Sequence, residues 1–390
     1  MEGTLKRRQW AAGMIGATLL LLEACGGGGA SGGGGGGGAG GSFTGVTISG
    51  GSTKFNGPMG VAVDGHGNIW VPNYGGNSVT ELLASSNYSA QSAVNISGGS
   101  TNFSNPNGIA VDAAENIWIP NYGNDSVTEL LASSNYSAQS AVNISGGTTG
   151  FSHPDGLTID GSGNVWVSNH HNASVTELLA PNYLASTAVN VSNATTGLNL
   201  NGPDGLVVDL SGRLWIPNDN GNSVTEVAIS SSGGASGGGN FASASFSAPD
   251  ASAVDQSGNI WTTNTSGNSV TEMTVSAGAT PTATFANFSG GSTGFNSPTE
   301  IAVDGAGNIW VANYTPNSVG ASVTELTKSS GYAVSSAVNL LESPAPGGPQ
   351  GIAVDASGNV WIANNLSNTV TELPGVATGL TALPKLAGSP

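Results

Sequence analysis

Short apolar runs separated by turn residues recur along most of the chain. In one unit, Gly60–Asp64 and Asn68–Val71 are two such runs, and Gly65–Gly67 separates them. A third run, Ser78–Leu82, and a fourth, Ala93–Ser97, follow. Runs of this length, rich in Val and Ile and bounded by glycine turns, predict β-strands, the first two forming a hairpin. No stretch after the first 25 residues shows helical periodicity.

This unit occurs seven times. Each copy carries an aspartate and, six residues later, a tryptophan: Asp64 and Trp70, Asp112 and Trp118, Asp160 and Trp166, Asp209 and Trp215, Asp255 and Trp261, Asp304 and Trp310, Asp355 and Trp361. Successive copies are 48, 48, 49, 46, 49 and 51 residues apart, and residues 81–99 and 129–147 are identical. A lone four-stranded sheet leaves its faces and edges exposed, whereas radial stacking covers them. We therefore predict an all-β fold, a seven-bladed β-propeller of four-stranded antiparallel blades.

The seventh unit shows three clear strands, ending near Leu373, and lacks an obvious fourth. Near the N-terminus, Val46–Thr53 matches Val94–Thr101, which contains the fourth strand of the first unit. We expect this early segment to complete blade seven, so that both ends of the chain share one sheet. The alternative is that Leu380–Leu383 closes the sheet.

The first 41 residues have a different composition. Lys6, Arg7 and Arg8 precede an apolar run that ends in Leu22–Cys25, which resembles the bacterial lipobox. We expect residues 1–24 to be a lipoprotein signal peptide, with Cys25 lipidated. Glu23 is unusual at its position, and the alternatives are an ordinary cleaved signal or an uncleaved anchor. Residues 25–41, almost all glycine, form a flexible tether, and residues 42–390 form the propeller.

Charge and cysteine content narrow the choice of partners. Residues 25–390 retain four basic and 22 acidic residues, a net charge of −18. Such a surface excludes nucleic acid as a partner. Cys25 is the only cysteine, so the chain has no internal disulfide, and lipidation accounts for an exported lone thiol. The expected location is the cell envelope, lipid-anchored to a bacterial membrane and facing the periplasm or the exterior.

Three motifs of each unit resemble the NHL repeat over residues 57–373. They are P-x-G-I-A-V-D, G-N-I-W-V-x-N and N-S-V-T-E-L. Asn73 and its equivalents stand where many NHL repeats have aspartate, and Ser78 stands where they often have arginine. The resemblance implies a propeller with a binding face, but it implies no reaction.

The repeats are also distantly similar to the streptogramin (virginiamycin B) lyases. That resemblance implies a histidine in a P-H-G slot, a glutamate three residues after the hairpin tryptophan, and magnesium. The first slot here holds Met59, Asn107, Asp155, Asp204, Asp250, Thr299 and Gln350. The second holds Asn73, Asn121, Asn169, Asn218, Asn264, Asn313 and Asn364, for which we expect bonds to the following turn. Elimination needs a proton acceptor, so these slots argue against a lyase.

Asp155, Asp204 and Asp250 occupy the first slot of three consecutive blades. The loop before an innermost strand lies at the channel mouth of a propeller, so these carboxylates should converge there. Clustered carboxylates favour calcium, magnesium or a cationic ligand, although no cofactor is required. The alternative is that each aspartate bonds the turn after its proline.

Aromatic and histidine side chains supply the remaining candidates. Tyr74, Tyr122 and Tyr314 follow the second strand of their units and form either an aromatic rim or part of the core. His170 and His171 occupy the corresponding loop of the third unit, as ligand contacts or as solvated residues. The tryptophans are expected between the blades as core.

These observations predict a cell-envelope-anchored, non-catalytic binding or scaffold propeller. Its ligand would be a protein, a glycan or a small molecule. The lipid would be its only contact with the membrane, and the protein would be a monomer. The alternative is a divalent-metal-dependent hydrolase or lyase of the streptogramin lyase or gluconolactonase type, acting at the channel mouth.

Overall fold

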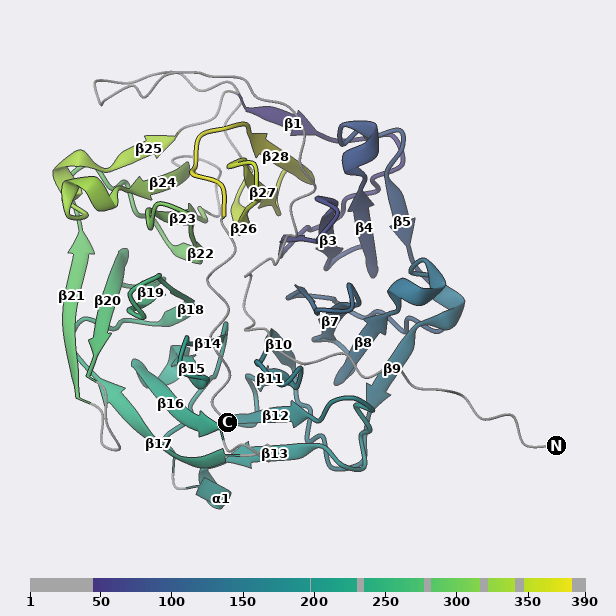
Figure 1. Cartoon of the computed structure of the whole chain (residues 1–390), viewed down its shortest axis with the longest axis horizontal. Coiled ribbons are helices and arrows are strands. Elements are labelled where there is room, and N and C mark those ends of the chain that lie inside the picture. The colour runs from purple at the N-terminus through teal and green to yellow at the C-terminus, as the bar shows by residue number, and fades with distance from the viewer. Residues whose placement is uncertain are drawn as a thin grey trace, which may run out of the picture.

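The computed structural model describes residues 45–196, 198–229, 235–276, 282–315, 322–340 and 347–380. Within these ranges, seven four-stranded antiparallel sheets stand as blades around a central axis (Figure 1). The predicted all-β, seven-bladed propeller is confirmed. None of the described helices is long and apolar enough to cross a membrane. The expected signal peptide, Cys25 and the glycine tether lie outside the described residues.

In six blades the strands follow one another in sequence from the axis outward. The innermost strands are β2 (Ala62–Val63), β6 (Ala110–Val111), β10 (Pro154–Ile159), β14 (Val207–Val208), β18 (Pro249–Val254), β22 (Pro298–Val303) and β26 (Pro349–Val354). The second strands are β3 (Ile69–Asn73), β7 (Ile117–Asn121), β11 (Val165–Asn169), β15 (Arg213–Asn218), β19 (Ile260–Asn264), β23 (Ile309–Asn313) and β27 (Val360–Asn364).

The outer half of each blade follows the same order. The third strands are β4 (Ser78–Leu82), β8 (Ser126–Leu130), β12 (Ser174–Leu178), β16 (Ser223–Ile229), β20 (Ser269–Val275), β24 (Ser322–Leu326) and β28 (Thr369–Leu373). The outermost strands are β5 (Val94–Ile96), β9 (Val142–Ser145), β13 (Val189–Ser192), β17 (Ala235–Ala242), β21 (Ala283–Ser289), β25 (Val338–Leu340) and β1 (Val46–Ile48). The short helical turns are η1 (Ala84–Ser86), η2 (Ala132–Ser134), η3 (Ala138–Ser140), α1 (Asn193–Thr196), η4 (Asp219–Gly221), η5 (Lys328–Ser330) and η6 (Val334–Ser336).

Blade seven joins the two ends of the chain. Strand β1 pairs antiparallel with β28, with Val46 opposite Glu372 and Ile48 opposite Val370. The sheet order β1-β28-β27-β26 therefore completes four strands (Figure 1). The predicted closure is confirmed. Strand β1 occupies the outer edge of β28, where the alternative placed Leu380–Leu383; residues 381–383 lie outside the described residues.

One aspartate organises each inner hairpin. Oδ1 of Asp64 accepts the backbone N–H groups of His66 and Asn68, both at 2.9 Å. Its Oδ2 accepts Nδ2 of Asn68 and Nε1 of Trp70, again at 2.9 Å. Gly67 has φ +80°, which L-residues with a side chain rarely adopt. Because the carboxylate satisfies four donors, it holds both the turn and the tryptophan in place.

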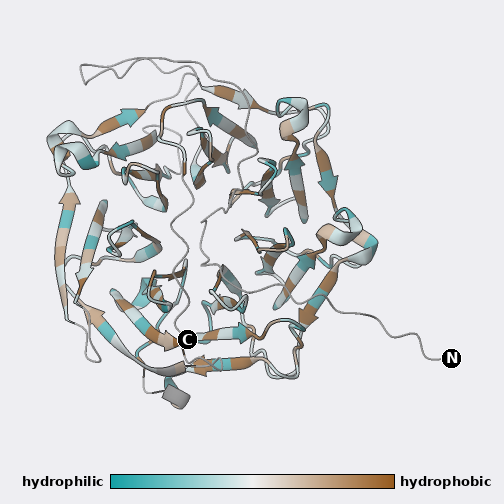
Figure 2. Cartoon of the chain, viewed as in Figure 1, coloured by the Kyte–Doolittle hydropathy of each residue, from teal (hydrophilic) through white to brown (hydrophobic). Residues whose placement is uncertain are grey.

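The tryptophans form the core between blades, as the sequence predicts. All seven are at most 1% exposed. Tyrosines of the following blade pack against several of them: the Tyr88 ring lies 4.5 Å from that of Trp361, and its hydroxyl donates to the Gly67 carbonyl. One cluster combines Val63 and Val71 with Trp361 and Val370, which joins blade one to blade seven. Figure 2 shows apolar positions along the strands of every blade.

The seven asparagines of the second slot are structural, but their partners differ from the expected ones. Nδ2 of Asn73 donates to Oγ of Ser78 and Oγ1 of Thr80, and its Oδ1 accepts the backbone N–H of Asn56. The side chain therefore holds the blade's entry loop, Asn56 included, against the third strand, and the turn that follows Asn73 receives none of these bonds. All seven are at most 1% exposed.

Candidate functional site

The first-slot residues of all seven blades line one cavity of about 240 Å³ on the propeller axis. In blades one, two and four the slot residue lies in the loop before the innermost strand, and an isolated bridge ties that loop to the end of the second strand, as between Pro58 and Asn73. In the other four blades the slot residue lies within the innermost strand itself. Gly156 follows its slot residue, and a Cβ there would lie only 3.0 Å from the Cα of Gly205. Glycine thus permits the close approach of neighbouring blades at the axis.

Asp155, Asp204 and Asp250 all line this cavity, so the expected convergence of the three carboxylates is observed. Burial raises the pKa of Asp155 to about 7. Burial, followed by repulsion from Glu300 and Asp155, raises that of Asp250 to about 8. Burial and then Asp155 and Asp250 raise the pKa of Asp204. The cavity therefore favours the protonated carboxyl groups unless a cation enters.

Glu300 is a fourth acidic lining residue, which the sequence analysis missed. It stands where five of the other six blades have glycine after the first slot and the sixth has alanine, Ala251. Burial raises its pKa to about 7, against the lowering effect of the Ile301 backbone N–H. In the sequence, Glu300 could have been found as the one charged residue at the glycine position of the P-x-G pattern.

Neighbouring polar groups already engage some of the carboxylate oxygens. Nδ2 of Asn107, the first-slot residue of blade two, donates to Oδ1 of Asp155. The Thr265 hydroxyl donates to Oδ2 of Asp250 at 3.1 Å. Thus Asp155 and Asp250 keep defined orientations. The alternative role of the aspartates, bonding the turn after the preceding proline, is not among the described side-chain hydrogen bonds of these residues.

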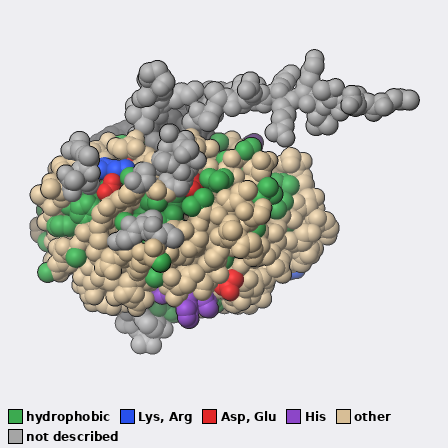
Figure 3. Space-filling model, turned by 90° about the horizontal axis from the view of Figure 1, so that it is seen from below, with side chains coloured by type: hydrophobic (Ala, Val, Ile, Leu, Met, Phe, Trp, Pro, Cys, Tyr) green, Lys and Arg blue, Asp and Glu red, His purple; other side chains and the backbone are tan. Residues whose placement is uncertain are grey.

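The side chains of the adjacent residues His170 and His171 have different neighbours. His170 follows β11, and its Nδ1 lies 3.8 Å from Oδ2 of Asp204, a residue that lines the acidic cavity. His171 instead stacks on His153, with ring centroids 4.8 Å apart. In the side view of Figure 3, histidine side chains gather at the lower flat face of the propeller, beside an acidic side chain.

An aromatic row extends across the first three blades. The ring of Tyr74 lies 6.3 Å from that of Tyr122, which packs edge-on against His153 at 4.7 Å, and His153 stacks on His171. Asp155 is among the charges that raise the pKa of Tyr122, after burial, so the row passes near the cavity. Tyr314, in blade six, is not part of the row. Of the three tyrosines considered for an aromatic rim, Tyr74 and Tyr122 lie in this row.

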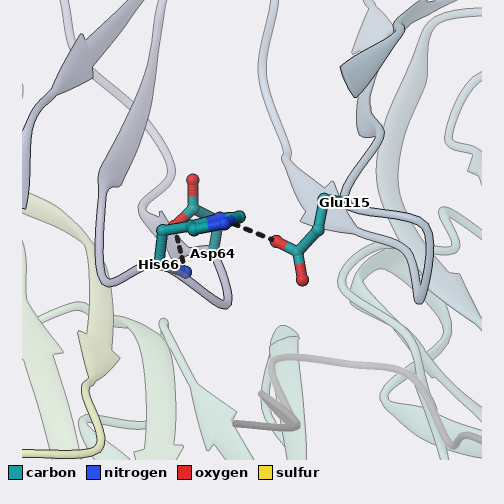
Figure 4. A group of neighbouring side chains, drawn as sticks. All are labelled: Asp64, His66 and Glu115. Atoms are coloured by element: carbon teal, nitrogen blue, oxygen red, sulfur yellow. Dashed lines mark hydrogen bonds and ion pairs between the residues drawn. The ribbon is translucent and has the colours of Figure 1, made fainter. Parts of the chain in front are cut away.

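Two groups of three side chains bring possible metal ligands within 4.8 Å of one another. The first is Asp64, His66 and Glu115, on the inner hairpins of blades one and two (Figure 4). Both Asp64 oxygens already accept hairpin donors, and Oε2 of Glu115 accepts the Gly65 backbone N–H at 2.8 Å. These three residues therefore form a clamp between blades. The second group is Asp155, His170 and Asp204, of which the two aspartates line the cavity.

No known family profile matches the chain, and no curated protein matches it in sequence. Solved structures of the same architecture do match. A streptogramin B lyase has 16% identity and a TM-score of 0.66, covering 85% of this chain and 96% of its own. Virginiamycin B lyase from Staphylococcus aureus has 14% identity and a TM-score of 0.67, covering 85% and 98%.

A third match is hydrazine synthase from Kuenenia stuttgartiensis, with 16% identity and a TM-score of 0.65, covering 84% of this chain and 97% of its own. Proteins with different names thus share this architecture at low identity, and fold does not carry function. The predicted similarity to the streptogramin lyases is confirmed at the level of the fold. This chain is a seven-bladed β-propeller of the kind found in those lyases.

Proposed function

We propose that this protein is a cell-envelope binding propeller with no catalytic role of its own, and that its axial cavity binds a small cation. One observation carries the proposal. Four carboxylates from four consecutive blades line a single cavity, and no lysine or arginine is among the described lining residues. The lining residues are Met59, Gly60, Asn107, Gly108, Asp155, Gly156, Asp204, Gly205, Asp250, Ala251, Thr299, Glu300 and Gln350.

The electrostatics support a cationic ligand. Asp155, Asp250 and Glu300 have pKa values raised to about 7, about 8 and about 7. A cation offsets both the burial and the mutual repulsion of their ionised forms, so binding lowers these pKa values and releases protons. The cavity volume suits an ion or a small amine, and oxygen ligands suit calcium and magnesium.

Calorimetric titration tests the proposal with calcium and, separately, a compact diamine. Protons must leave the carboxyl groups, so we expect binding at pH 8.5 to be about 10-fold tighter than at pH 6. The triple variant Asp155→Asn, Asp204→Asn, Asp250→Asn should lose it. Asp125→Asn is the matched control, because Asp125 is exposed and an amide oxygen can still accept the His153 N–H. Absence of binding to the wild type at millimolar ligand, or equal binding by the triple variant, contradicts the proposal.

The envelope location rests on the leader pattern before Cys25 and on the glycine tether. The protein is proposed to act as a monomer, held at the membrane by its lipid alone. A metal-dependent hydrolase or lyase acting at the same mouth is the competing function. A panel of lactone, ester and streptogramin substrates separates the two, and we expect no turnover with or without added calcium or magnesium.

A further inference from the structure

Three side chains from two adjacent blades meet beside the axial cavity, which two of them, Asp155 and Asp204, line. Asp155 lies in β10, His170 follows β11 of the same blade, and Asp204 precedes β14 of the next. One ligand atom of each, an imidazole nitrogen or a carboxylate oxygen, lies within 4.8 Å of the other two. The group depends on His170, because the bridge between Pro154 and Asn169 brings the turn after β11 beside the slot.

No hydrogen bond to Nδ1 explains the position of the His170 imidazole. Nδ1 of His170 is buried and has no hydrogen-bond partner among the described residues. It lies 3.8 Å from Oδ2 of Asp204, which is too long for a hydrogen bond. A buried polar nitrogen without a partner is costly, and such an atom calls for an explanation. A bound ion would supply the missing partner.

The spacing suits two ligands of one ion. Ligand atoms about 2.1 Å from a tetrahedral zinc ion lie roughly 3.4 Å from each other, close to the observed separation of Nδ1 and Oδ2. Burial lowers the pKa of His170, so its neutral form, which carries the lone pair, is favoured near neutral pH. The charge of the two aspartates would be offset by a divalent ion.

We propose that His170, Asp155 and Asp204 hold a divalent transition-metal ion of the zinc class at the channel mouth. This inference rests on the proposed function, because it names the cation for one site beside the cavity. An imidazole ligand favours zinc and its neighbours, whereas calcium and magnesium prefer oxygen alone. Three protein ligands leave a coordination position open toward the cavity, where Asp250 and Glu300 also face.

The test compares Zn²⁺, Ca²⁺ and the diamine on the full-length chain in detergent. We expect the wild type to bind Zn²⁺ at least about 10-fold more tightly than Ca²⁺. His170→Gln should weaken Zn²⁺ binding about 10-fold or more, and Ca²⁺ or diamine binding by less than about twofold. Asp204→Asn removes a second proposed ligand and should weaken Zn²⁺ binding in the same way. His66→Gln is the control, because His66 belongs to the other group of possible ligands, at the hairpin clamp.

The outcomes separate the two proposals. Equal Zn²⁺ affinity of the wild type and a folded His170→Gln variant overturns the zinc site, as does a loss confined to His66→Gln. Calcium or diamine binding without Zn²⁺ preference also overturns it, and leaves the proposed cation-binding function standing. Failure of every cation to bind overturns both. Melting temperatures of the variants establish that each is folded before the titrations are compared.

Discussion

The carboxylate of Asp64 accepts four hydrogen bonds, and the six equivalent aspartates take the same role in their hairpins. In blade four an arginine replaces the usual asparagine, and Nε of Arg213 donates to Oδ2 of Asp209 at 2.8 Å. Charge-assisted hydrogen bonds of this kind are among the stronger ones in proteins. The hairpin aspartates are therefore structural, whereas the aspartates of the first slot face the cavity.

Glu115 departs from the hairpin pattern in a way that can be measured. Its φ is +65°, and the other six blades have glycine with a positive φ at the same position of this turn. A residue with a Cβ in this region costs about 1–2 kcal/mol. The Glu115 carboxylate offsets part of this free-energy cost, because it accepts the Gly65 N–H of the neighbouring blade.

We expect Glu115→Ala to lose the bond between blades and keep the backbone strain, which destabilises the fold by about 1–2 kcal/mol. Glu115→Gly loses the bond but relieves the strain, so it should be about 1 kcal/mol more stable than the alanine variant. Denaturant unfolding of both variants measures the difference. An alanine variant as stable as the glycine variant would show that the strain is absent.

A buried or half-buried glutamate of the third strand stands opposite the tryptophan in each blade, as Glu81 does opposite Trp70. Burial, and then the hairpin aspartate, raises the pKa values of Glu81, Glu129 and Glu325 to about 7, from an ordinary value of 4.5. A raised folded-state pKa contributes stability below the unfolded pKa, and that contribution is lost as pH rises through the folded value. The relevant window is therefore about pH 4.5 to 7.

We expect the melting temperature to fall as pH rises from about 5 to about 7.5. Glutamine mimics the protonated carboxyl, so the variant Glu81→Gln, Glu129→Gln, Glu325→Gln should show a smaller fall over the same range. Thermal unfolding at closely spaced pH values is the measurement. A pH profile that rises over this window, or one that is identical in the variant, would contradict the assignment.

At the scale of elements, most strands end where their turn residues begin, and proline is accommodated inside them. Pro72 lies within β3 opposite Val79, and pairing continues to Asn73 opposite Ser78. Proline lacks only the donor, and its carbonyl accepts the Met59 N–H from the entry loop. Pairing therefore continues through this proline to the end of the strand.

Strand β1 has a larger role than its three residues suggest, because it covers the edge of blade seven and buries Ile48. We expect deletion of residues 42–51 to destabilise the propeller by about 3 kcal/mol or more, through lost apolar burial and an exposed edge. Deletion of residues 32–41, ten residues of the tether, is the matched control and should leave the melting temperature unchanged. Equal melting temperatures of the two deletions would count against closure by β1.

At the scale of the whole molecule, the lipid anchor is the expected link between the propeller and the cell. Cys25→Ala removes the site of lipidation, so we expect the protein to move from the detergent-soluble membrane fraction to the soluble extracytoplasmic fraction. Cell fractionation followed by immunoblotting measures the change. Membrane association that persists in the variant would indicate an uncleaved apolar helix in place of the lipid.

Much of this architecture follows from the sequence alone. The seven Asp and Trp pairs determine the number of blades. Each hairpin is a local structure, because its aspartate, its turn and its core tryptophan lie within about seven residues. The match between residues 46–53 and 94–101 was enough to predict the closure. Local hydrogen bonds and a constant period leave few alternative folds.

The site depended on the tertiary structure. The sequence places Asp155, Asp204 and Asp250 in one slot, but only the packing of blades shows that Glu300 joins them and that His170 turns inward while His171 stacks on His153. These contacts join residues 18 to 145 positions apart, and they depend on how closely glycine lets the blades approach the axis. A periodic sequence specifies each blade, whereas the chemistry of the axis comes from where single residues break the repeat.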